Sequence, residues 1–210
     1  MQPVDTCQIK FFWQGKTYSF QPEGNGNYVI SDTSIRLRAG DTVSILLYDG
    51  QQRIFSTTII PNKPSHFKSS MSSIAMPSFS DGFNRDVFRD FEPIELTWTN
   101  PDSSYYMIAI QPVNSSAKPV NPKDTLENDG RVRIFRNEPA ITDNYRFEPF
   151  QFRYYGYNFV ILYHLNPEYA ALYKFSGNTS LNIKEPVTNI ENAMGIFTGI
   201  NADTLKIYVY

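Results

Sequence analysis

The sequence predicts a mainly β protein with two β-sandwich units and one short helix near residues 167–175. Three observations favour this fold class. Aromatic residues make up 15% of the 210 residues and charged residues only 19%, and aromatic side chains suit the pleated, half-buried surface of a sheet. Short runs of alternating apolar and polar residues recur along the chain. Turn signals rich in Gly, Asn and Asp separate these runs.

The first predicted unit occupies residues 1–62. Residues 8–13 and 16–20 flank Gln14 and Gly15, a pattern typical of a β-hairpin with a glycine turn. Similar turn signals separate the further strands that we expect in this unit, over residues 28–30, 35–38, 42–48 and 53–60.

The second predicted unit occupies residues 91–210. It follows residues 63–90, which we expect to form a linker or a long loop because they are rich in Pro, Ser and Lys. A strand over residues 94–99 places Trp98 on its apolar face, and an Asn-Pro-Asp turn precedes a tyrosine-rich strand over residues 105–110. This order resembles the B–C hairpin of a fibronectin type III-like sandwich, which implies that Trp98 lies in the core. Later strands are expected over residues 131–135, 146–155, 157–164 and 204–210.

The one predicted helix lies near residues 167–175. Asn166 can cap its N-terminus, Pro167 suits the first helical position, and Glu168 suits the positive end of the helix dipole. Aromatic and apolar residues then repeat at helical spacing until Gly177 stops the helix. We expect this helix to cover one edge of a sandwich.

Composition excludes several classes of function. The net charge is −2, so no basic excess is available to hold a phosphate backbone, and we expect no nucleic-acid partner. No apolar run approaches the roughly 20 residues that span a bilayer, and no signal-peptide pattern opens the chain. Cys7 is the only cysteine, which excludes an intramolecular disulfide and a cysteine-based zinc cage. We predict neither a metal nor a cofactor.

Residues near the C-terminus carry a family resemblance. Residues 189–197 read Asn-Ile-Glu-Asn-Ala-Met-Gly-Ile-Phe, which resembles N-I-x-N-G-x-G-I-F, a signature of Bacteroidetes-type surface lipoproteins of unknown function. Ala193 stands where that family favours Gly, the residue suited to a turn with positive φ. Residues 8–60 resemble the transthyretin-like, or immunoglobulin-like, half of the same proteins, with Gly15-Lys16-Thr17-Tyr18 at the first hairpin.

The resemblance implies a cellular location but no chemical reaction. It implies an outer-membrane lipoprotein of the cell envelope, held by a lipid anchor upstream of this sequence and working beside a nutrient-uptake receptor. The expected partners are that receptor, another protein or a glycan. Asp41-Thr42, Asp124-Thr125 and Asp203-Thr204 resemble the O-glycosylation sites of such bacteria, although Asp-Thr also simply starts strands after turns.

Few residues are candidates for catalysis. His66 and His164 are the only histidines, neither lies in a metal-binding spacing, and we interpret His164 as structural. A carboxylate cluster could supply an acid–base pair for glycoside hydrolysis. Its three aspartates, together with Asn84, could instead hold Ca²⁺ through oxygen ligands. A solvated loop explains the same cluster, and we assign no catalytic residue. The carboxylates are Asp81, Asp86, Asp90, Glu92 and Glu95.

Aromatic residues are densest between Tyr145 and Phe175. Both faces of the predicted strand over residues 146–155 carry rings, whereas only one face needs to join a core. The remaining rings could form a stacking platform for sugars or a protein-contact patch. We predict Tyr154, Tyr155 and Tyr157 as ligand-binding residues, with core packing against the helix as the alternative.

Three hypotheses for the function therefore stay open. The first is a non-catalytic envelope lipoprotein that serves as a binding or accessory module. The second is an adhesin or fimbria-like subunit, for which residues 205–210 provide the candidate exchangeable strand, although their alternation fits ordinary sheet closure equally well. The third is a carboxylate-dependent glycoside hydrolase.

Overall fold

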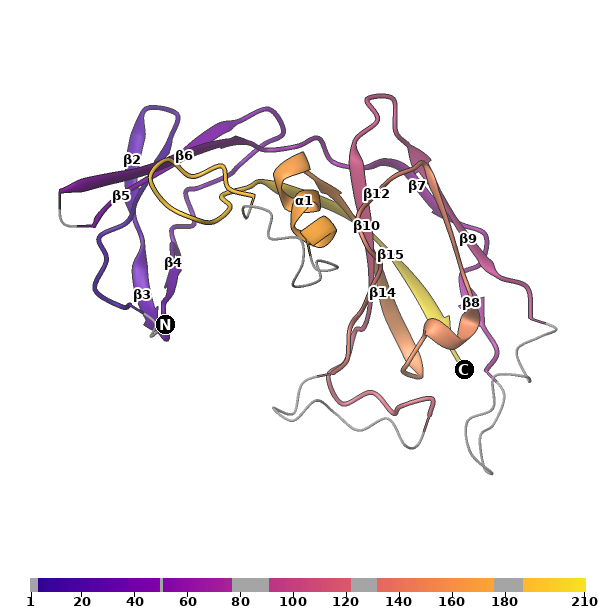
Figure 1. The fold of residues 1–210 in the computed structure, drawn as a ribbon. Helices are drawn as coiled ribbons and strands as arrows, with labels where there is room; N and C mark the ends of the chain where they lie inside the picture. Colours follow the sequence, from indigo (N-terminus) through magenta and orange to yellow (C-terminus); the bar gives the residue numbers. More distant parts are fainter. Residues whose placement is uncertain (1–3, 50, 77–90, 122–131, 176–186) are drawn as a thin grey trace, which may run out of the picture. The chain divides into compact units, whose positions relative to one another are not determined.

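A computed structural model describes residues 4–49, 51–76, 91–121, 132–175 and 187–210 (Figure 1). The described chain is mainly β, as predicted, with one short α-helix. Its contacts divide it into two compact units. Unit 1 comprises Met1–Asn62 and Asn166–Asn201, and unit 2 comprises Lys63–Leu165 and Ala202–Tyr210.

The division after residue 62 coincides with the predicted one, but the return of the chain to unit 1 was not predicted. The helix and residues 189–197 were expected in the second unit, over residues 91–210, and this assignment was wrong. Their hydrogen bonds go instead to β6 (Gln52–Ile59). The Ser56 hydroxyl donates to the carbonyl of Asn189 at 2.7 Å, and the Asn166 amide donates to the carbonyl of Ile59 at 2.9 Å.

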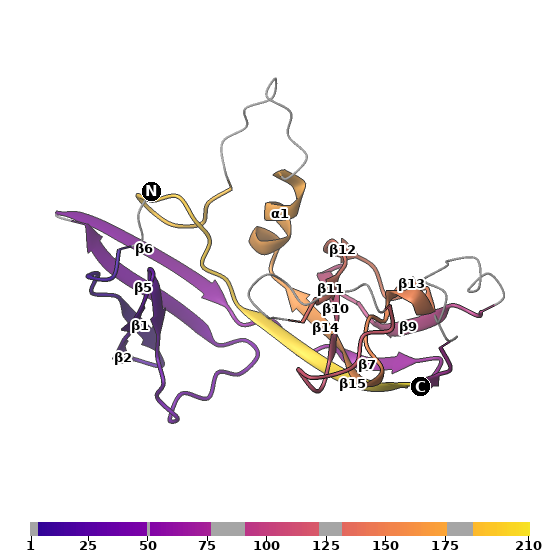
Figure 2. The same cartoon turned by 90° about the horizontal axis from the view of Figure 1, so that it is seen from below.

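Unit 1 is built on a four-stranded sheet in the order β2-β1-β5-β6 (Figure 2). The predicted first hairpin is confirmed, because β1 pairs with β2 and Gln14 and Gly15 have φ values of 49° and 73°. This left-handed pair is what a two-residue type I′ turn requires. The two long strands expected over residues 42–48 and 53–60 are also formed, and they pair with each other. The strands are β1 (Lys10–Trp13), β2 (Lys16–Ser19), β5 (Thr42–Asp49) and β6.

The core of unit 1 lies on one face of this sheet. Phe11, Trp13, Val43 and Ile60 are buried there, and Phe197 packs against them. A separate hairpin, β3 (Gln21–Gly24) with β4 (Asn27–Val29), lies outside the four-stranded sheet.

The strand predicted over residues 35–38 is not formed. The carboxylate of Asp32 accepts the backbone N–H of Ser34, and the carboxylate of Asp41 accepts that of Arg38, both at 2.8 Å. Local side-chain acceptors of this kind compete with a β ladder for the same backbone groups. They hold the segment as turns and extended chain despite its alternating pattern.

Helix α1 (Pro167–Phe175) has the bounds that the sequence predicts, with Pro167 at its start and Glu168 in its first turn. The backbone carbonyl of Asn166 accepts the N–H groups of Tyr169 and Ala170. The side-chain amide nitrogen of Asn166 donates to Thr58 and Ile59 in β6. Gly177, the predicted stop, lies outside the described residues.

Unit 2 is a sandwich of two sheets. The smaller sheet has the order β13-β9-β7, and the larger has the order β11-β10-β14-β15-β8 with β12 paired to β10. Figure 1 shows β10, β14 and β15 running side by side in the larger sheet. The strands are β7 (Ser65–Ser69), β8 (Ser73–Ile74), β9 (Ile94–Thr99), β10 (Tyr105–Pro112), β11 (Phe135–Arg136), β12 (Ala140–Ile141), β13 (Asn144–Phe147), β14 (Gly156–Leu165) and β15 (Ile200–Val209), whose first two residues belong to unit 1.

Apolar residues of both sheets meet in the core of unit 2, and Trp98 is buried among them as predicted. Alternation explains this, because Ile94, Leu96 and Trp98 point to one face of β9 while the residues between them are exposed. Two predictions about the same region were wrong. The expected linker contains β7 and β8, and the expected hairpin does not exist because β9 and β10 lie in different sheets.

The long strand predicted over residues 146–155 was also wrong. Strand β13 ends at Phe147, a short 3-10 helix spans Pro149–Gln151, and β14 begins at Gly156, whose φ is +88°. Proline lacks the N–H that a ladder needs, so the chain turns there. The apolar strand over 157–164 does lie in the middle of a sheet, between β10 and β15, although only one of its faces is fully buried.

Candidate functional site

The three predicted ligand-binding tyrosines do not form one site. Tyr154 is only 3% exposed, and its hydroxyl accepts the backbone N–H of Arg133 at 3.0 Å. Tyr155 is half-buried and packs against the core of unit 2, with the Lys118 ammonium 5.9 Å from its ring centroid. Tyr157 is 58% exposed. The prediction was therefore wrong for Tyr154, which is a core residue, and of the three only Tyr157 is largely exposed.

The neighbours of Tyr157 come from the C-terminal strand. The centroid of its ring lies 4.9 Å from that of Tyr208, and the Tyr208 ring lies 6.0 Å from that of Tyr210. Tyr208 is 40% exposed and Tyr210 is 59% exposed. We call Tyr157, Tyr208 and Tyr210 the tyrosine strip. Three contacting rings on one face make a continuous aromatic surface.

Strand geometry places these rings on the outer face of the larger sheet. Ile207 and Val209 of β15 are buried in the core, so the alternate residues Lys206, Tyr208 and Tyr210 face outward. On β14 the same alternation buries Asn158 and exposes Tyr157. Strand β15 is held on both sides near the strip, by β14 and by β8. The strip therefore rests on a paired, rigid part of the sheet.

The polar groups of the strip are available to a ligand. Among the described residues, the three tyrosine hydroxyls make no hydrogen bond. Lys206 lies two residues before Tyr208 on the same face of β15, and its ammonium is 5.6 Å from the centroid of the Phe159 ring. Ser73 pairs with Tyr208 in the sheet and is exposed. The strip thus offers ring faces and hydroxyl groups, and Lys206 adds one cation beside it.

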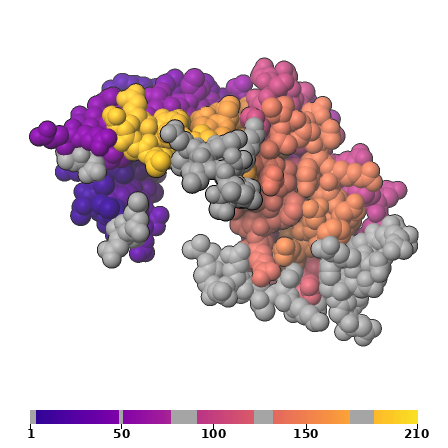
Figure 3. Space-filling view, in the orientation of Figure 1, coloured from indigo at the N-terminus to yellow at the C-terminus, as the bar shows by residue number. Residues whose placement is uncertain are grey.

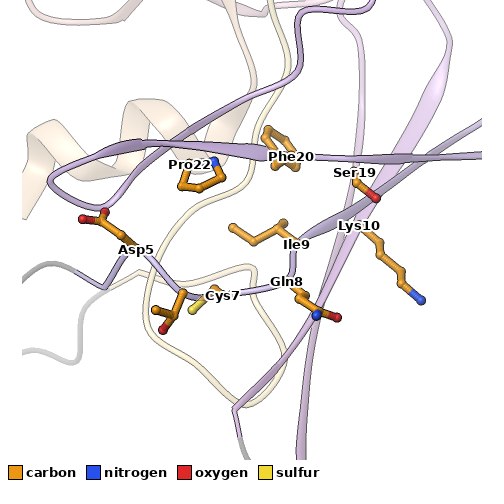
Figure 4. A pocket seen from close by; sticks show the side chains of 9 residues that line it. Asp5, Cys7, Gln8, Ile9, Lys10, Ser19, Phe20 and Pro22 are labelled. Carbon is orange, nitrogen blue, oxygen red and sulfur yellow. The ribbon is translucent and has the colours of Figure 1, made fainter.

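A second feature is a shallow pocket of about 270 Å³ in unit 1 (Figure 4). Ile9 lies between Pro22 and Cys7 in this view, and the side chain of Lys10 points away from them. Two of the polar groups at its rim serve local structure, because Asp5 accepts the backbone N–H of Gly26 and the Cys7 N–H donates to the hydroxyl of Tyr28. The geometry assigns no chemistry to the free Cys7 thiol.

The residues considered for catalysis do not assemble in the described part of the chain. His164 is buried and stacks on Tyr106 with centroids 4.9 Å apart. His66 lies at a bulge, where its Nδ1 contacts the hydroxyl of Thr99 at 2.9 Å. Glu95 points to solvent from β9. Asp81, Asp86 and Asp90, with Asn84, lie outside the described residues. No group of three metal-binding side chains occurs within the described ranges.

Residues 189–197 act as a clasp on the edge of β6. The Asn189 side chain accepts the N–H of Phe197 at 2.9 Å and donates to its carbonyl at 2.7 Å, which closes the segment into a loop. The N–H of Glu191 donates to the carbonyl of Phe55, and the Glu191 carboxylate pairs with Arg53 at 3.0 Å. The yellow atoms of the loop lie against purple atoms of the first unit in Figure 3. The loop therefore pairs an edge strand that would otherwise be open.

The departure from the family pattern at Ala193 causes no backbone strain. Asn192 has a φ of 63° and Gly195 a φ of 150°, whereas Ala193 is not among the residues with positive φ. Asparagine tolerates the left-handed region better than most residues. Ala193 therefore fits a position that does not need glycine.

Sequence reasoning missed Tyr208 and Tyr210 as site residues. The signal was present in the alternation of residues 205–210, which puts apolar residues on one face and Lys, Tyr and Tyr on the other. We considered that run as an exchangeable strand. The structure instead places it between β14 and β8, in ordinary sheet closure.

Comparison with models of known protein families and with curated proteins found no match to this chain. Within the described residues, no helix has the length and apolar character needed to cross a membrane.

Proposed function

We propose that this protein is a non-catalytic binding module that holds a saccharide on the tyrosine strip. One observation carries the proposal, namely three contacting tyrosine rings that are each 40% exposed or more. Aromatic side chains of this size usually join a core or an interface. A contiguous exposed set on a rigid sheet is typical of a surface that a partner covers.

A saccharide suits the strip better than a protein does. Tyrosine combines an apolar ring face, which stacks on the C–H face of a sugar, with a hydroxyl that bonds to sugar hydroxyls. Lys206 lies beside the strip on the same face, and lysine is depleted from the cores of protein–protein interfaces. The strip also lies on a sheet whose strands are paired on both sides, so little conformational entropy is lost on binding.

The family resemblance adds a cellular location to this proposal. A surface lipoprotein beside an outer-membrane uptake receptor would use such a module to retain a glycan near the receptor. In native cells the full-length protein should fractionate with the outer membrane and incorporate labelled fatty acid. Recovery in the soluble fraction without label would remove the envelope part of the proposal and leave the binding module.

The binding test is a screen of soluble oligosaccharides by isothermal titration calorimetry, with Tyr157→Ala and Tyr208→Ala as variants. A ligand that covers about 50 Å² of one ring gains about 1.3 kcal/mol. Each substitution should therefore weaken binding about tenfold. Tyr48→Ala is the matched control, because Tyr48 is 56% exposed but lies on β5 of unit 1.

Two results would overturn this function. One is the absence of saccharide binding across neutral and acidic oligosaccharides by the folded protein. The other is a ligand whose affinity falls equally with Tyr48→Ala and Tyr208→Ala, because the binding surface would then not be the strip. Circular dichroism and a melting curve for each variant separate loss of binding from loss of folding.

A further inference from the structure

The charged residues at the described strand positions on the outer face of the larger sheet are of one sign. The residues on the same face as the strip follow from the pairing of strands β10, β11, β12 and β14 and from the alternation of side chains along β15. Among these described positions, Lys206 and Arg136 are charged and both are basic. The acidic residue of β15, Asp203, pairs with Lys63 at 2.9 Å.

Unlike Arg53 and Lys63, Lys206 has no carboxylate partner among the described residues. Arg53 pairs with Glu191 and Lys63 with Asp203. The ammonium of Lys206 instead lies 5.6 Å from the centroid of the Phe159 ring. A cation over an aromatic ring keeps its full charge while the ring limits where it lies. Lys206 is thus an oriented positive charge beside three exposed rings.

We propose that the saccharide held by the strip is anionic and that Lys206 binds its acidic group. This inference rests on the proposed function. Lys206 and Tyr208 lie two residues apart on one face of β15, which separates their Cα atoms by about 6.6 Å. A sugar ring stacked on Tyr208 therefore carries an acidic substituent within reach of the Lys206 ammonium. Complementary charge also steers an anionic ligand to the site.

Hexuronic acids present this chemistry, because each residue joins a ring that can stack to a carboxylate that can pair with an ammonium. Sulfated sugars present the same sign of charge on a different group. The experiment must therefore compare carboxylate with sulfate, and both with a neutral ligand of the same skeleton.

The test measures the Kd of an oligogalacturonate, of its fully methyl-esterified neutral form, and of a sulfated oligosaccharide of equal length. The wild-type protein should bind the oligogalacturonate at least tenfold more tightly than its methyl ester. Lys206→Gln should remove most of that difference and leave the Kd of the ester within about twofold. Lys118→Gln is the matched control, because Lys118 also lies over an aromatic ring, that of Tyr155, at 5.9 Å. It should change neither Kd.

Salt provides a second readout. Raising the ionic strength from 0.05 to 0.5 M shortens the Debye length severalfold, from well above to well below about 10 Å. It should weaken binding of the oligogalacturonate to the wild type and have little effect on Lys206→Gln.

The outcomes separate this inference from the proposed function. Equal affinity for the acid and its ester, with loss on Tyr208→Ala, would overturn the role of Lys206 and leave a neutral-glycan module. Tighter binding of the sulfated sugar would keep the anionic class and replace carboxylate by sulfate. Binding of poly-glutamate as tight as that of the oligogalacturonate would overturn both, because the partner would then be an acidic polypeptide.

Discussion

The clasp formed by residues 189–197 makes a stability prediction that follows from one side chain. Asn189→Ala removes two hydrogen bonds, one to the N–H and one to the carbonyl of Phe197, at 2.9 and 2.7 Å. Each neutral bond contributes about 1 kcal/mol net. The free energy of unfolding of unit 1 should therefore fall by about 2 kcal/mol. Loosening of the loop also weakens its bonds to β6, which makes this value a lower bound.

Urea unfolding measures this change. Trp13 and Trp98 are the only tryptophans, and they lie in different units, so in a Trp98→Phe background the fluorescence reports unit 1 alone. A loss of about 2 kcal/mol lowers the urea midpoint by about 1 M if the m-value is about 2 kcal/mol/M. Asn114→Ala is the control, because its side chain makes one exposed bond to the N–H of Ser116 in unit 2.

The Asn189→Asp variant separates the two bonds. Aspartate keeps the acceptor for the Phe197 N–H and loses the donor to the Phe197 carbonyl, so it should destabilise unit 1 by at least half as much as Asn189→Ala. A midpoint shift below about 0.25 M for Asn189→Ala, or one equal to that of Asn114→Ala, would contradict the stabilising role of residues 189–197.

Four further substitutions, at three positions, test other contacts. The backbone N–H of Arg38, and to a lesser extent the indole N–H of Trp13, lower the pKa of Asp41 below its usual 3.8. Because the folded-state pKa is depressed, the stability that Asp41 contributes is present above about pH 4 and is lost as the pH falls through the lowered value. Asp41→Asn should therefore flatten the acid dependence of unit 1 unfolding, measured by fluorescence. The buried Nε1 of Trp98 has no hydrogen-bond partner among the described residues, so in thermal unfolding Trp98→Phe should cost less than about 1.5 kcal/mol, whereas Trp98→Ala should cost about 3–5 kcal/mol. Equal costs would contradict this account. A Cβ at position 199 would lie 3.0 Å from the carbonyl oxygen of Ile59, so Gly199→Ala should destabilise unit 1 by about 1–3 kcal/mol in urea titration, and an unchanged midpoint would mean that the backbone yields.

Local signals predicted several elements well. Gln14 and Gly15 specify a tight turn through their own backbone preferences, and Pro167 starts a helix with its fixed φ. Alternation predicted that Trp98 is buried, because one face of β9 is apolar. These predictions depend on residues within a few positions of each other, so the sequence alone contains the information.

Predictions that needed a partner strand were less successful. The aromatic run over residues 146–155 reads as one strand, but Pro149 and Gly156 break it into a short strand, a turn of 3-10 helix and the start of β14. Residues 35–38 alternate like a strand, yet side-chain carboxylates occupy two of the backbone N–H groups in and around the segment. The N–H that proline lacks decided the first case, and side-chain acceptors that compete for backbone N–H groups decided the second.

The sequence by itself determined the mainly β class of this protein, the two main hairpins of unit 1, the helix, and the alternation that puts Lys206, Tyr208 and Tyr210 on one face of β15, because each follows from short-range periodicity and turn chemistry. Only the tertiary structure decided which tyrosines meet. Tyr157 and Tyr208 are far apart in the chain, and their contact depends on the placement of β15 beside β14. A shift of one residue in that pairing would place the Tyr208 side chain in the core and the Ile207 side chain in solvent. The burial of Ile207 and Val209 fixes the register, and with it the tyrosine strip.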